Sequence, residues 1–306
     1  MAWQVEDLQD QSGRVVVITG GNSGIGYEAA KALAGCGAQV VIACRDIAKG
    51  KEACTSIKKE TGTEVSTELL DLSSLQSVHI AADAIKNRYD QIDVLINNAG
   101  VMAIPRRLTE DGFETQLATN HFGHFALTAL LFPLLRDTPD ARVVTVSSLA
   151  HQFGYLNFIN LHGQAFYDPW AAYGQSKLAN LLFAFELDRR CRAAGVSLRS
   201  NACHPGIAAT NLGYAGPRMM GSTFGETLMQ FYTSIVAQSA ADGALPTLYA
   251  GFAPAADGGD YIGPDGLGEM RGNPRKVSSS FLSRSEPLAR QLWAVTEEAT
   301  QVEFTV

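Results

Sequence analysis

The sequence predicts an α/β fold built on a doubly wound parallel β-sheet, and three observations support this prediction. Short, continuous apolar runs recur along the first half of the 306-residue chain, as expected for parallel strands that are buried on both faces. Stretches long enough for helices separate these runs, so strands and helices alternate. A glycine-rich turn directly follows the first apolar run and opens the first helix.

The predicted elements follow one another in a regular order. The apolar runs predict strands at Val15–Ile18, Val40–Ala43, Val94–Ile96 and Val143–Val146, with a more polar strand at Glu64–Leu70. The stretches between them predict helices at Gly26–Ala34, Ile47–Glu60, Leu75–Tyr89 and Phe113–Leu135. A long helix at Ala171–Ala194 and a strand at Leu198–Cys203 follow. This order implies right-handed βαβ crossovers and a Rossmann-type sheet.

One domain over residues 1–306 is predicted, because no linker rich in proline, serine or charge divides the chain. The alternation breaks at about residues 207–239, where apolar residues at helical spacing follow a glycine-rich start. Two interpretations of this segment stay open: a helical flap over a site, or an ordinary amphipathic core helix. Residues from about 273 to 306 are expected to form a C-terminal extension.

Composition narrows the class of protein. A net charge of -7 argues against nonspecific nucleic-acid binding, which needs a basic face. The five scattered cysteines show no CxxC spacing, which favours a reduced cytoplasmic setting over disulfides or a zinc site. The acidic N-terminus does not resemble a secretory signal, and the longest apolar stretch, Phe125–Leu135, is too short to span a bilayer. We therefore expect a soluble, cytoplasmic protein without a transmembrane segment.

The glycine-rich turn at Thr19–Gly26 predicts a dinucleotide site. Its glycines allow a pyrophosphate to approach the backbone closely, and the helix N-terminus that follows offers free N–H groups and a positive dipole end. A plain glycine-rich turn is the alternative, but the strand–loop–helix context argues against it. The spacing is Gly-x-x-x-Gly-x-Gly, and the expected cofactor contacts are Gly20, Asn22, Ser23, Gly24, Ile25 and Gly26.

The end of the second strand bears on the choice of cofactor. Arg45 stands where a guanidinium could bind a ribose 2′-phosphate, with Lys49 in support, so NADP(H) is the preferred cofactor. Asp46 leaves NAD(H) open, because an acidic residue there can hold a 2′-hydroxyl. The alternative is a solvated Arg45 and an Asp46 that caps the next helix.

The chain contains two Tyr-x-x-x-Lys pairs, Tyr173/Lys177 and Tyr27/Lys31. A phenol beside an ammonium on one helix face is an acid/base device, because the cation favours the phenolate. Tyr27 directly follows Gly26 and is expected under the phosphates, whereas a hydride-transfer acid must lie near the nicotinamide. Tyr173/Lys177 is therefore the predicted catalytic pair.

Polar residues at other strand ends are expected near this pair, since ligands of open α/β sheets bind beyond the carboxyl ends of the strands. They are Asn97–Gly100 and the hydroxyls of Ser147 and Ser148. Asn120 is polar amid apolar neighbours, and a satisfied core amide is its alternative interpretation.

The histidines do not predict a metal site. His121 and His124 share a helix without a third ligand at metal spacing. A structural role is favoured for His204.

Together these features resemble the short-chain dehydrogenase/reductase superfamily over about residues 13–272. The resemblance rests on five motifs in the expected order: Thr19–Gly26, Asn97–Gly100, Val146–Ser148, Tyr173–Lys177 and Pro205–Gly206. Residues 172–183 and 261–272 look most like retinol-dehydrogenase-like members and the related WW-domain oxidoreductases. They are similar, less closely, to light-dependent protochlorophyllide reductases.

The resemblance implies a role for each matching residue. Tyr173 would be the general acid/base, and Lys177 would lower the pKa of Tyr173 and bind the nicotinamide ribose. Ser148 would orient the carbonyl, and Asn120 would hold a water that links Lys177 to solvent. Asp71 and Leu72 would flank the adenine. The other implied cofactor contacts are Asn98, Ala99, Gly100, Tyr173, Lys177, Pro205, Gly206, Ile207 and Thr210.

The sequence departs from the simplest members in one respect. The gap between Ser148 and Tyr173 is longer, so an extra loop at about residues 151–170 is expected to border the site, as in retinol-dehydrogenase-like members. The N-terminal hydrophobic anchor of the membrane-anchored members is not seen in this sequence. Superfamily members often pair through the helices that carry Asn120 and Tyr173, so a homo-oligomer is expected unless this loop obstructs that surface.

The predicted function is that of an NADP(H)-dependent oxidoreductase that interconverts a carbonyl and an alcohol. An apolar small-molecule substrate is expected if the flap covers the site, because it contains Met219, Met220, Phe224, Leu228, Met229, Phe231 and Tyr232. The alternatives are a regulatory protein that binds NADP(H) without turnover and a light-dependent tetrapyrrole reductase.

Overall fold

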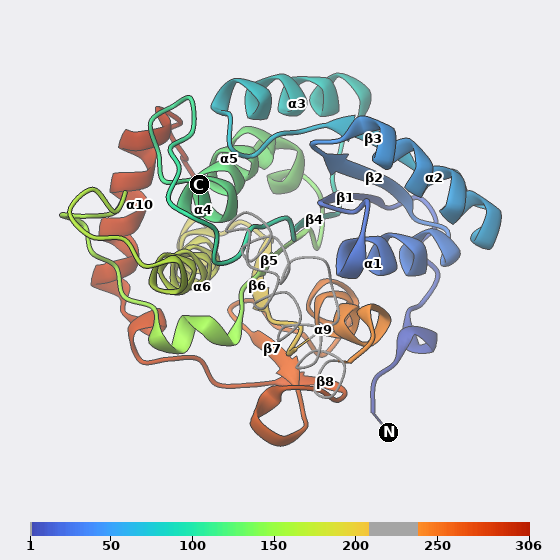
Figure 1. The fold of residues 1–306 in the computed structure, drawn as a ribbon. Coiled ribbons are helices and arrows are strands. Elements are labelled where there is room, and N and C mark those ends of the chain that lie inside the picture. The colour runs from blue at the N-terminus through green and yellow to red at the C-terminus, as the bar shows by residue number, and fades with distance from the viewer. Residues whose placement is uncertain (1, 208–237) are drawn as a thin grey trace, which may run out of the picture.

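The structure is a computed structural model, and it describes residues 2–207 and 238–306. Eight strands form one sheet in the order β3-β2-β1-β4-β5-β6-β7-β8 (Figure 1), and all neighbouring strands are parallel except β7 and β8. The strands are β1 Val15–Thr19, β2 Gln39–Cys44, β3 Ser66–Leu69, β4 Val94–Asn97, β5 Arg142–Val146, β6 Arg199–Cys203, β7 Tyr261–Pro264 and β8 Pro274–Lys276.

Helices cover both faces of the sheet. Figure 1 shows α3, α5 and α6 over one face and α1, α2 and α9 over the other. Their bounds are α1 Gly24–Gly35, α2 Ile47–Thr61, α3 Leu75–Arg88, α5 Gly123–Arg136, α6 Pro169–Ala194 and α9 Ala240–Phe252. Shorter helical turns and the last helix are η1 Val5–Asp7, α4 Thr115–Leu117, η2 Ala118–Phe122, η3 Leu149–Phe153, η4 Leu267–Glu269, η5 Leu282–Arg284 and α10 Glu286–Thr300.

The predicted doubly wound sheet is confirmed. In β1, Val15 and Val17 pack into the core on the α3–α5 side, whereas Val16 and Ile18 pack into the core on the α1–α9 side. Both faces of the strand are therefore buried, which explains why its sequence is a continuous apolar run. The chain winds outward from β1 to β3 and then crosses to β4 on the other side of β1, so the loops after β1 and β4 diverge.

The predicted helix over residues 113–135 is wrong in detail. Glu114 caps a short α4 by accepting hydrogen bonds from the backbone of Gln116 and Leu117, and a π-helical turn, η2, then separates α4 from α5. The apolar pattern runs through this break, and it therefore gives no sign of the change in helical pitch. Most of the predicted flap at about residues 207–239 lies outside the described residues.

The C-terminal helix α10 packs along α6. Its Trp293 stacks on Phe183 of α6 at 5.9 Å between ring centroids and meets Phe125 of α5 edge-on at 5.0 Å. Phe304, beyond the end of α10, lies 4.9 Å from the same indole. This face of α5 and α6 is thus occupied by the chain itself, and a partner chain would have to displace α10 to reach it. Across residues 2–207 and 238–306, no helix is long and apolar enough to cross a membrane.

Helix α1 starts in very close contact with the strand ends. A Cβ atom on Gly26 would lie 2.5 Å from the Gly20 carbonyl oxygen and 2.6 Å from Nδ2 of Asn98. At the other end of the same helix, a Cβ on Gly35 would make only an ordinary contact, 3.8 Å from Cγ2 of Thr61. The first glycine is required by packing and the second is not.

We therefore expect Gly26→Ala and Gly35→Ala to change stability in opposite directions. The added methyl group at Gly26 overpacks the turn and should lower the free energy of unfolding by about 1–3 kcal/mol. The same change at Gly35 should be neutral or raise it by up to about 1 kcal/mol, because alanine favours the helix. Urea denaturation of both variants measures the two effects, and equal losses would contradict the steric explanation.

Candidate active site

The polar loops predicted from the sequence meet at one edge of the sheet. The strands β1, β4, β5 and β6 are adjacent and parallel, so their carboxyl ends lie side by side. The glycine-rich turn follows β1, Asn98–Gly100 follows β4, Ser147 and Ser148 follow β5, and His204–Gly206 follows β6. The structure thus brings together segments that lie up to about 180 residues apart in the chain.

The turn after β1 has the backbone that a phosphate site needs. Gly20 and Gly24 have φ angles of 66° and 56°, in the left-handed region that favours glycine. Helix α1 begins at Gly24, and the side chain of Ser23 makes no capping hydrogen bond. The first N–H groups of a helix lack partners within the helix, so this end can bind an anion.

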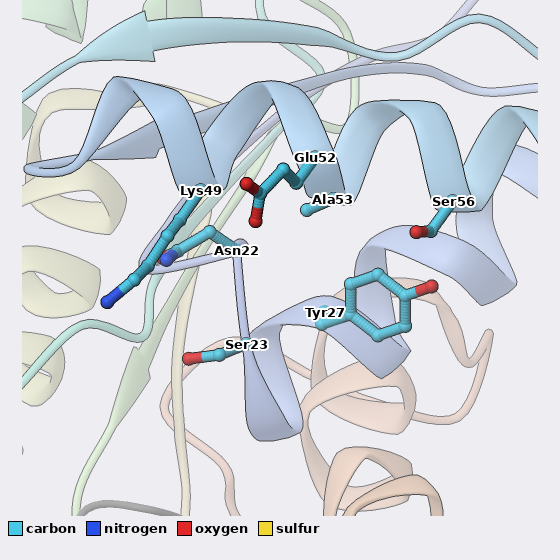
Figure 2. Close-up of a pocket in the computed structure, with 7 residues that line it drawn as sticks. All are labelled: Asn22, Ser23, Tyr27, Lys49, Glu52, Ala53 and Ser56. Atoms are coloured by element: carbon cyan, nitrogen blue, oxygen red, sulfur yellow. The ribbon is translucent and has the colours of Figure 1, made fainter.

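A groove of about 500 Å³ runs from this turn along α2. Figure 2 shows Asn22 and Lys49 at one end of the groove, and Tyr27 and Ser56 at the other. The end with the amide and the ammonium lies beside the phosphate turn and offers groups that suit a further phosphate. The sequence predicts cofactor contacts for Asn22, Ser23 and Lys49. All three line this groove.

Arg45 and Asp46 differ in their environment after β2. The Asp46 side chain caps α2 by accepting a hydrogen bond from the Lys49 backbone at 3.1 Å, and its other oxygen lies 3.6 Å from Lys49 Nζ. Capping lowers the pKa of this carboxyl group. Arg45 is exposed and makes no hydrogen bond or ion pair with the described part of the chain. The capping role that the sequence left open for Asp46 is thus the one observed.

The loop after β4 is fixed by Thr19, the last residue of β1. Its hydroxyl oxygen accepts hydrogen bonds from the backbone N–H groups of Asn98 at 2.9 Å and Ala99 at 3.0 Å. The Asn98 amide also donates to the Thr19 carbonyl oxygen at 2.9 Å. Gly100 lies close to two predicted catalytic residues, because a Cβ there would be 3.0 Å from Oδ1 of Asn120 and 3.6 Å from Nζ of Lys177.

The loop after β3 holds the two residues predicted near the adenine. The Asp71 carboxylate accepts hydrogen bonds from the Ser73 backbone at 2.9 Å and the Ser73 hydroxyl at 2.6 Å. Leu72 is buried, and its carbonyl group lies against Gly123 at the start of α5. Both residues follow a strand at the same edge of the sheet as the phosphate turn.

Asn120 joins three segments from within the π-helical turn η2. Its Oδ1 accepts from the Val101 backbone at 2.8 Å, and its Nδ2 donates to the Val101 carbonyl oxygen at 2.9 Å. The same Nδ2 donates to the Ser176 hydroxyl at 2.8 Å, which in turn donates to the Tyr173 carbonyl oxygen at 2.8 Å. Asn120 is fully buried and is a satisfied amide, yet the groups that satisfy it belong to the site itself.

Tyr173 is only 4% exposed, and it lies beside Ser148. Burial raises the pKa of Tyr173 to about 12, although the nearby Ser148 side chain acts in the opposite direction. The neighbouring Ser147 hydroxyl donates to the Lys177 carbonyl oxygen at 2.8 Å and is thus engaged elsewhere. The second serine is therefore the one that reaches the phenol.

Lys177 is buried one helical turn after Tyr173, with its Nζ 5.8 Å from the centre of the phenol ring. This ammonium donates to the Val146 carbonyl oxygen at 3.0 Å. Burial lowers the pKa of Lys177 to about 8. The sequence predicts that Lys177 lowers the pKa of Tyr173, but burial of the phenol raises this pKa instead, and the group that acts against burial is Ser148.

The second pair, Tyr27 and Lys31, lies in a different setting. The Tyr27 hydroxyl donates to Glu60 at 3.0 Å, and Lys31 pairs with Glu28 at 2.7 Å and Glu60 at 3.5 Å. Partial burial and the Glu60 carboxylate raise the pKa of Tyr27. This pair belongs to an ion cluster between α1 and α2, in a different part of the structure from Tyr173.

The motif after β6 is held by a buried histidine. His204 Nδ1 accepts from the Gly206 backbone at 3.2 Å, and its Nε2 donates to Glu269 at 3.0 Å. The side chain is fully buried, and burial lowers its pKa to about 3, so the structural role favoured by the sequence is the observed one. Ile207 bonds through its backbone to Met270 and Gln238, both at 2.8 Å. Thr210 lies outside the described residues.

The extra loop predicted before α6 packs against the start of that helix. Trp170, in the first turn of α6, meets the Tyr173 ring edge-on, with 6.2 Å between ring centroids, and remains 47% exposed. Gln175 anchors the loop by accepting from the Asn157 backbone at 3.2 Å and donating to the Leu161 carbonyl oxygen at 3.1 Å. Trp170, Ser176 and Gln175 also lie around Tyr173 and were not predicted from the sequence as site residues. Their only signal was a position within one helical turn of Tyr173.

Comparison with known proteins agrees with this geometry. The family model described as short chain dehydrogenase matches residues 14–216. Retinol dehydrogenase 13 of Homo sapiens is 41% identical over 287 residues, which cover 92% of this chain and 83% of that protein. Polyprenol dehydrogenase of Mus musculus is 40% identical over 295 residues, which cover 94% and 84%.

Solved structures show the same fold. A crystal structure of a protein from Mycobacterium paratuberculosis superposes with a TM-score of 0.82 at 42% identity, over 100% of both chains. A short chain dehydrogenase from Shigella flexneri, solved in complex with NADP, has a TM-score of 0.63 at 23% identity and covers 83% of this chain and 98% of its own. The chain belongs to the short-chain dehydrogenase family, in its retinol-dehydrogenase-like branch, and is an oxidoreductase of alcohol and carbonyl groups.

Proposed function

We propose that this protein is an NADP(H)-dependent oxidoreductase that interconverts an alcohol and a carbonyl group on an apolar small molecule. The observation that carries the proposal is the convergence of Tyr173, Ser148, Lys177 and Asn120 at the edge of the sheet where the phosphate turn lies. A protein that only senses the cofactor does not need a buried acid/base beside a second hydroxyl. The names of two relatives, a retinol and a polyprenol dehydrogenase, refer to apolar alcohols and support this substrate class.

The residues present fit a dinucleotide. The phosphate turn has two glycines in the left-handed region and an uncapped helix start, and Gly26 lets the start of α1 pack directly against the turn at Gly20. Asn22, Ser23, Gly24, Ile25 and Gly26 would hold the pyrophosphate, and Lys177 would hold the nicotinamide ribose. When bound, NADP(H) supplies the hydride for reduction or accepts it in oxidation.

The chain's own residues perform the proton transfer. In reduction, the Tyr173 hydroxyl donates its proton to the oxygen of the substrate as negative charge develops there. The raised pKa of Tyr173, about 12, keeps this group protonated at neutral pH, as an acid must be. Ser148 donates a hydrogen bond to the same oxygen and stabilises the developing alkoxide. In oxidation, the Lys177 ammonium favours the phenolate that takes up the proton.

The preference for NADP(H) over NAD(H) rests on the end of β2. Asp46 caps α2 through one carboxylate oxygen, and its other oxygen lies 3.6 Å from the Lys49 ammonium, so this carboxylate is directed at α2. Arg45 is exposed beside it, and the ammonium of Lys49 lines the groove next to the phosphate turn. Two cations near an engaged carboxylate favour a 2′-phosphate.

Tyr173→Phe should abolish turnover while leaving the binding of NADPH nearly intact. Removing the proton donor should lower kcat by about 100- to 10,000-fold, the usual contribution of general acid catalysis. A panel of apolar ketones, aldehydes and alcohols, followed by nicotinamide absorbance, measures turnover, and nicotinamide fluorescence measures binding. Tyr27→Phe removes the matching hydroxyl of the other pair and should retain activity. A fully active Tyr173 variant would contradict the assignment.

Arg45→Ala should weaken the binding of NADPH far more than that of NADH. Loss of a charge-assisted hydrogen bond costs about 1.5–3 kcal/mol, which corresponds to a dissociation constant about 10- to 100-fold higher for NADPH. Lys59→Ala removes an exposed cation from the far end of α2 and should leave both affinities unchanged. Equal losses for the two cofactors would mean that another group holds the 2′-phosphate.

Lys177→Met should stabilise the protein near pH 7 while it removes activity. Because burial lowers the pKa of Lys177 from 10.5 to about 8, the unfolded chain binds this proton more tightly than the folded protein does. The cost to stability is fully present below pH 8 and disappears as the pH rises towards 10.5. The variant should therefore be about 3 kcal/mol more stable at pH 7, with the gain vanishing near pH 10.5.

Denaturant titrations between pH 7 and 10.5 measure this difference. Lys51→Met, at an exposed position of α2, serves as the control and should show no such dependence on pH. A Lys177 variant that is less stable than the natural protein at pH 7 would refute the assigned cost of burying the ammonium.

A further inference from the structure

His124 links two parts of the site that come from distant segments of the chain. Its Nδ1 lies 3.0 Å from the backbone carbonyl oxygen of Asn120, and its Nε2 lies 2.8 Å from the hydroxyl of Thr19. The imidazole is only 1% exposed. It therefore spans the space between the π-helical turn η2 and the end of β1, in the layer between α5 and the sheet.

The protonation of this imidazole follows from its partners. A carbonyl oxygen can only accept, so Nδ1 must carry the proton that is donated to Asn120. Burial lowers the pKa of His124 to about 4, so the ring is neutral at physiological pH and Nε2 has a free lone pair. The Thr19 hydroxyl then donates to Nε2. The carbonyl oxygen of Asn120 and the hydroxyl of Thr19 together fix His124 in the tautomer protonated at Nδ1.

The Thr19 hydroxyl is fully used in this arrangement. Its one proton goes to His124, and its two lone pairs accept from the backbone of Asn98 at 2.9 Å and Ala99 at 3.0 Å. These four hydrogen bonds form one series with a single direction. Asn98 and Ala99 donate to Thr19, Thr19 donates to His124, and His124 donates to Asn120. Exchange of any member for an apolar residue leaves buried partners unsatisfied.

We propose that His124 is a positioning residue that couples the Asn120 turn to the loop Asn98–Gly100, and so holds the catalytic and cofactor-binding parts of the site in register. Asn120 is fixed at its side chain by Val101 and Ser176 and at its backbone by His124. Asn98 and Ala99 are fixed by Thr19 on the other side of the same imidazole. That the loop Asn98–Gly100 contacts NADP(H) is part of the proposed function, and this inference rests on it.

His121 offers a matched comparison within the same helical region. It is equally buried and lies three residues earlier, but its Nε2 bonds to the Thr296 hydroxyl of α10 at 3.0 Å. It packs in the aromatic cluster of Phe122, Phe125 and Phe183. His121 therefore serves the core, on the side of α5 that faces the C-terminal helix, whereas His124 faces the site.

The test is a double-mutant cycle on the full-length protein. His124→Leu, Thr19→Val and the double variant are compared with His121→Leu, each at a temperature where circular dichroism shows it to be folded. NADPH affinity is measured by nicotinamide fluorescence, and kcat and KM are measured with the best apolar substrate. Each single variant should lower kcat by about 100-fold through misplacement of Asn120 and of the cofactor loop, and should raise the dissociation constant of NADPH by about 10-fold.

The double variant should be no worse than the more affected single variant, because both changes break one chain of hydrogen bonds. His121→Leu should cost stability but change kcat and NADPH affinity by less than about threefold. Multiplicative effects in the double variant, or a His124 variant that behaves like the His121 variant, would overturn the proposal. A natural protein that binds NADPH but converts no apolar alcohol or carbonyl would contradict the proposed function. In that case the NADPH affinities of the variants would still test whether His124 positions the loop Asn98–Gly100.

Discussion

The site depends on the way in which the Asn120 amide is satisfied inside the protein. Both of its side-chain polar atoms bond to the backbone of Val101, and the second also reaches Ser176 on α6, the helix that carries Tyr173 and Lys177. An unsatisfied buried amide costs about 1–3 kcal/mol, so these bonds strongly favour one arrangement of the β4 loop, the turn η2 and α6. The π-helical pitch of η2 is part of this arrangement, and π turns are frequent at functional sites.

Burial has opposite effects on the pKa values of Tyr173 and Lys177. It raises the pKa of Tyr173 and lowers that of Lys177, so it favours the neutral form of each residue. The Val146 carbonyl oxygen partly offsets the cost for the ammonium, and it also accepts a hydrogen bond from Asn180 at 3.0 Å. The protein therefore keeps a charged group in its interior at a cost to stability, which is typical of residues retained for function.

The sequence predicted those elements that leave a local pattern in it, such as a continuous apolar run or a glycine spacing. Continuous apolar runs located β1, β2, β4 and β5 because these strands are buried on both faces, and the glycine spacing located the turn between β1 and α1. The break within residues 113–135 was not predicted, since it depends on Asn120 bonding to Val101 and not on apolar periodicity. The contact of His124 with Thr19 was not predicted either, because Thr19 lies about 100 residues away in sequence and no local pattern reveals such a contact.

Buried and exposed residues around Tyr173 differ in how they are held in place. Tyr173, Lys177 and Asn120 are almost fully buried and are fixed by hydrogen bonds from β5, α6 and the β4 loop. Trp170, in the first turn of α6, is half exposed beside the phenol. The loop before α6 is held by backbone contacts to Gln175 and by its own side chains, because the Tyr167 hydroxyl bonds to Gln116 and to the Ile104 carbonyl oxygen, and Leu156 and Leu161 are buried. Among the described residues of this region, the exposed side chains of Tyr155, Ile159, Phe166 and Trp170 are therefore the ones that can vary without loss of these contacts.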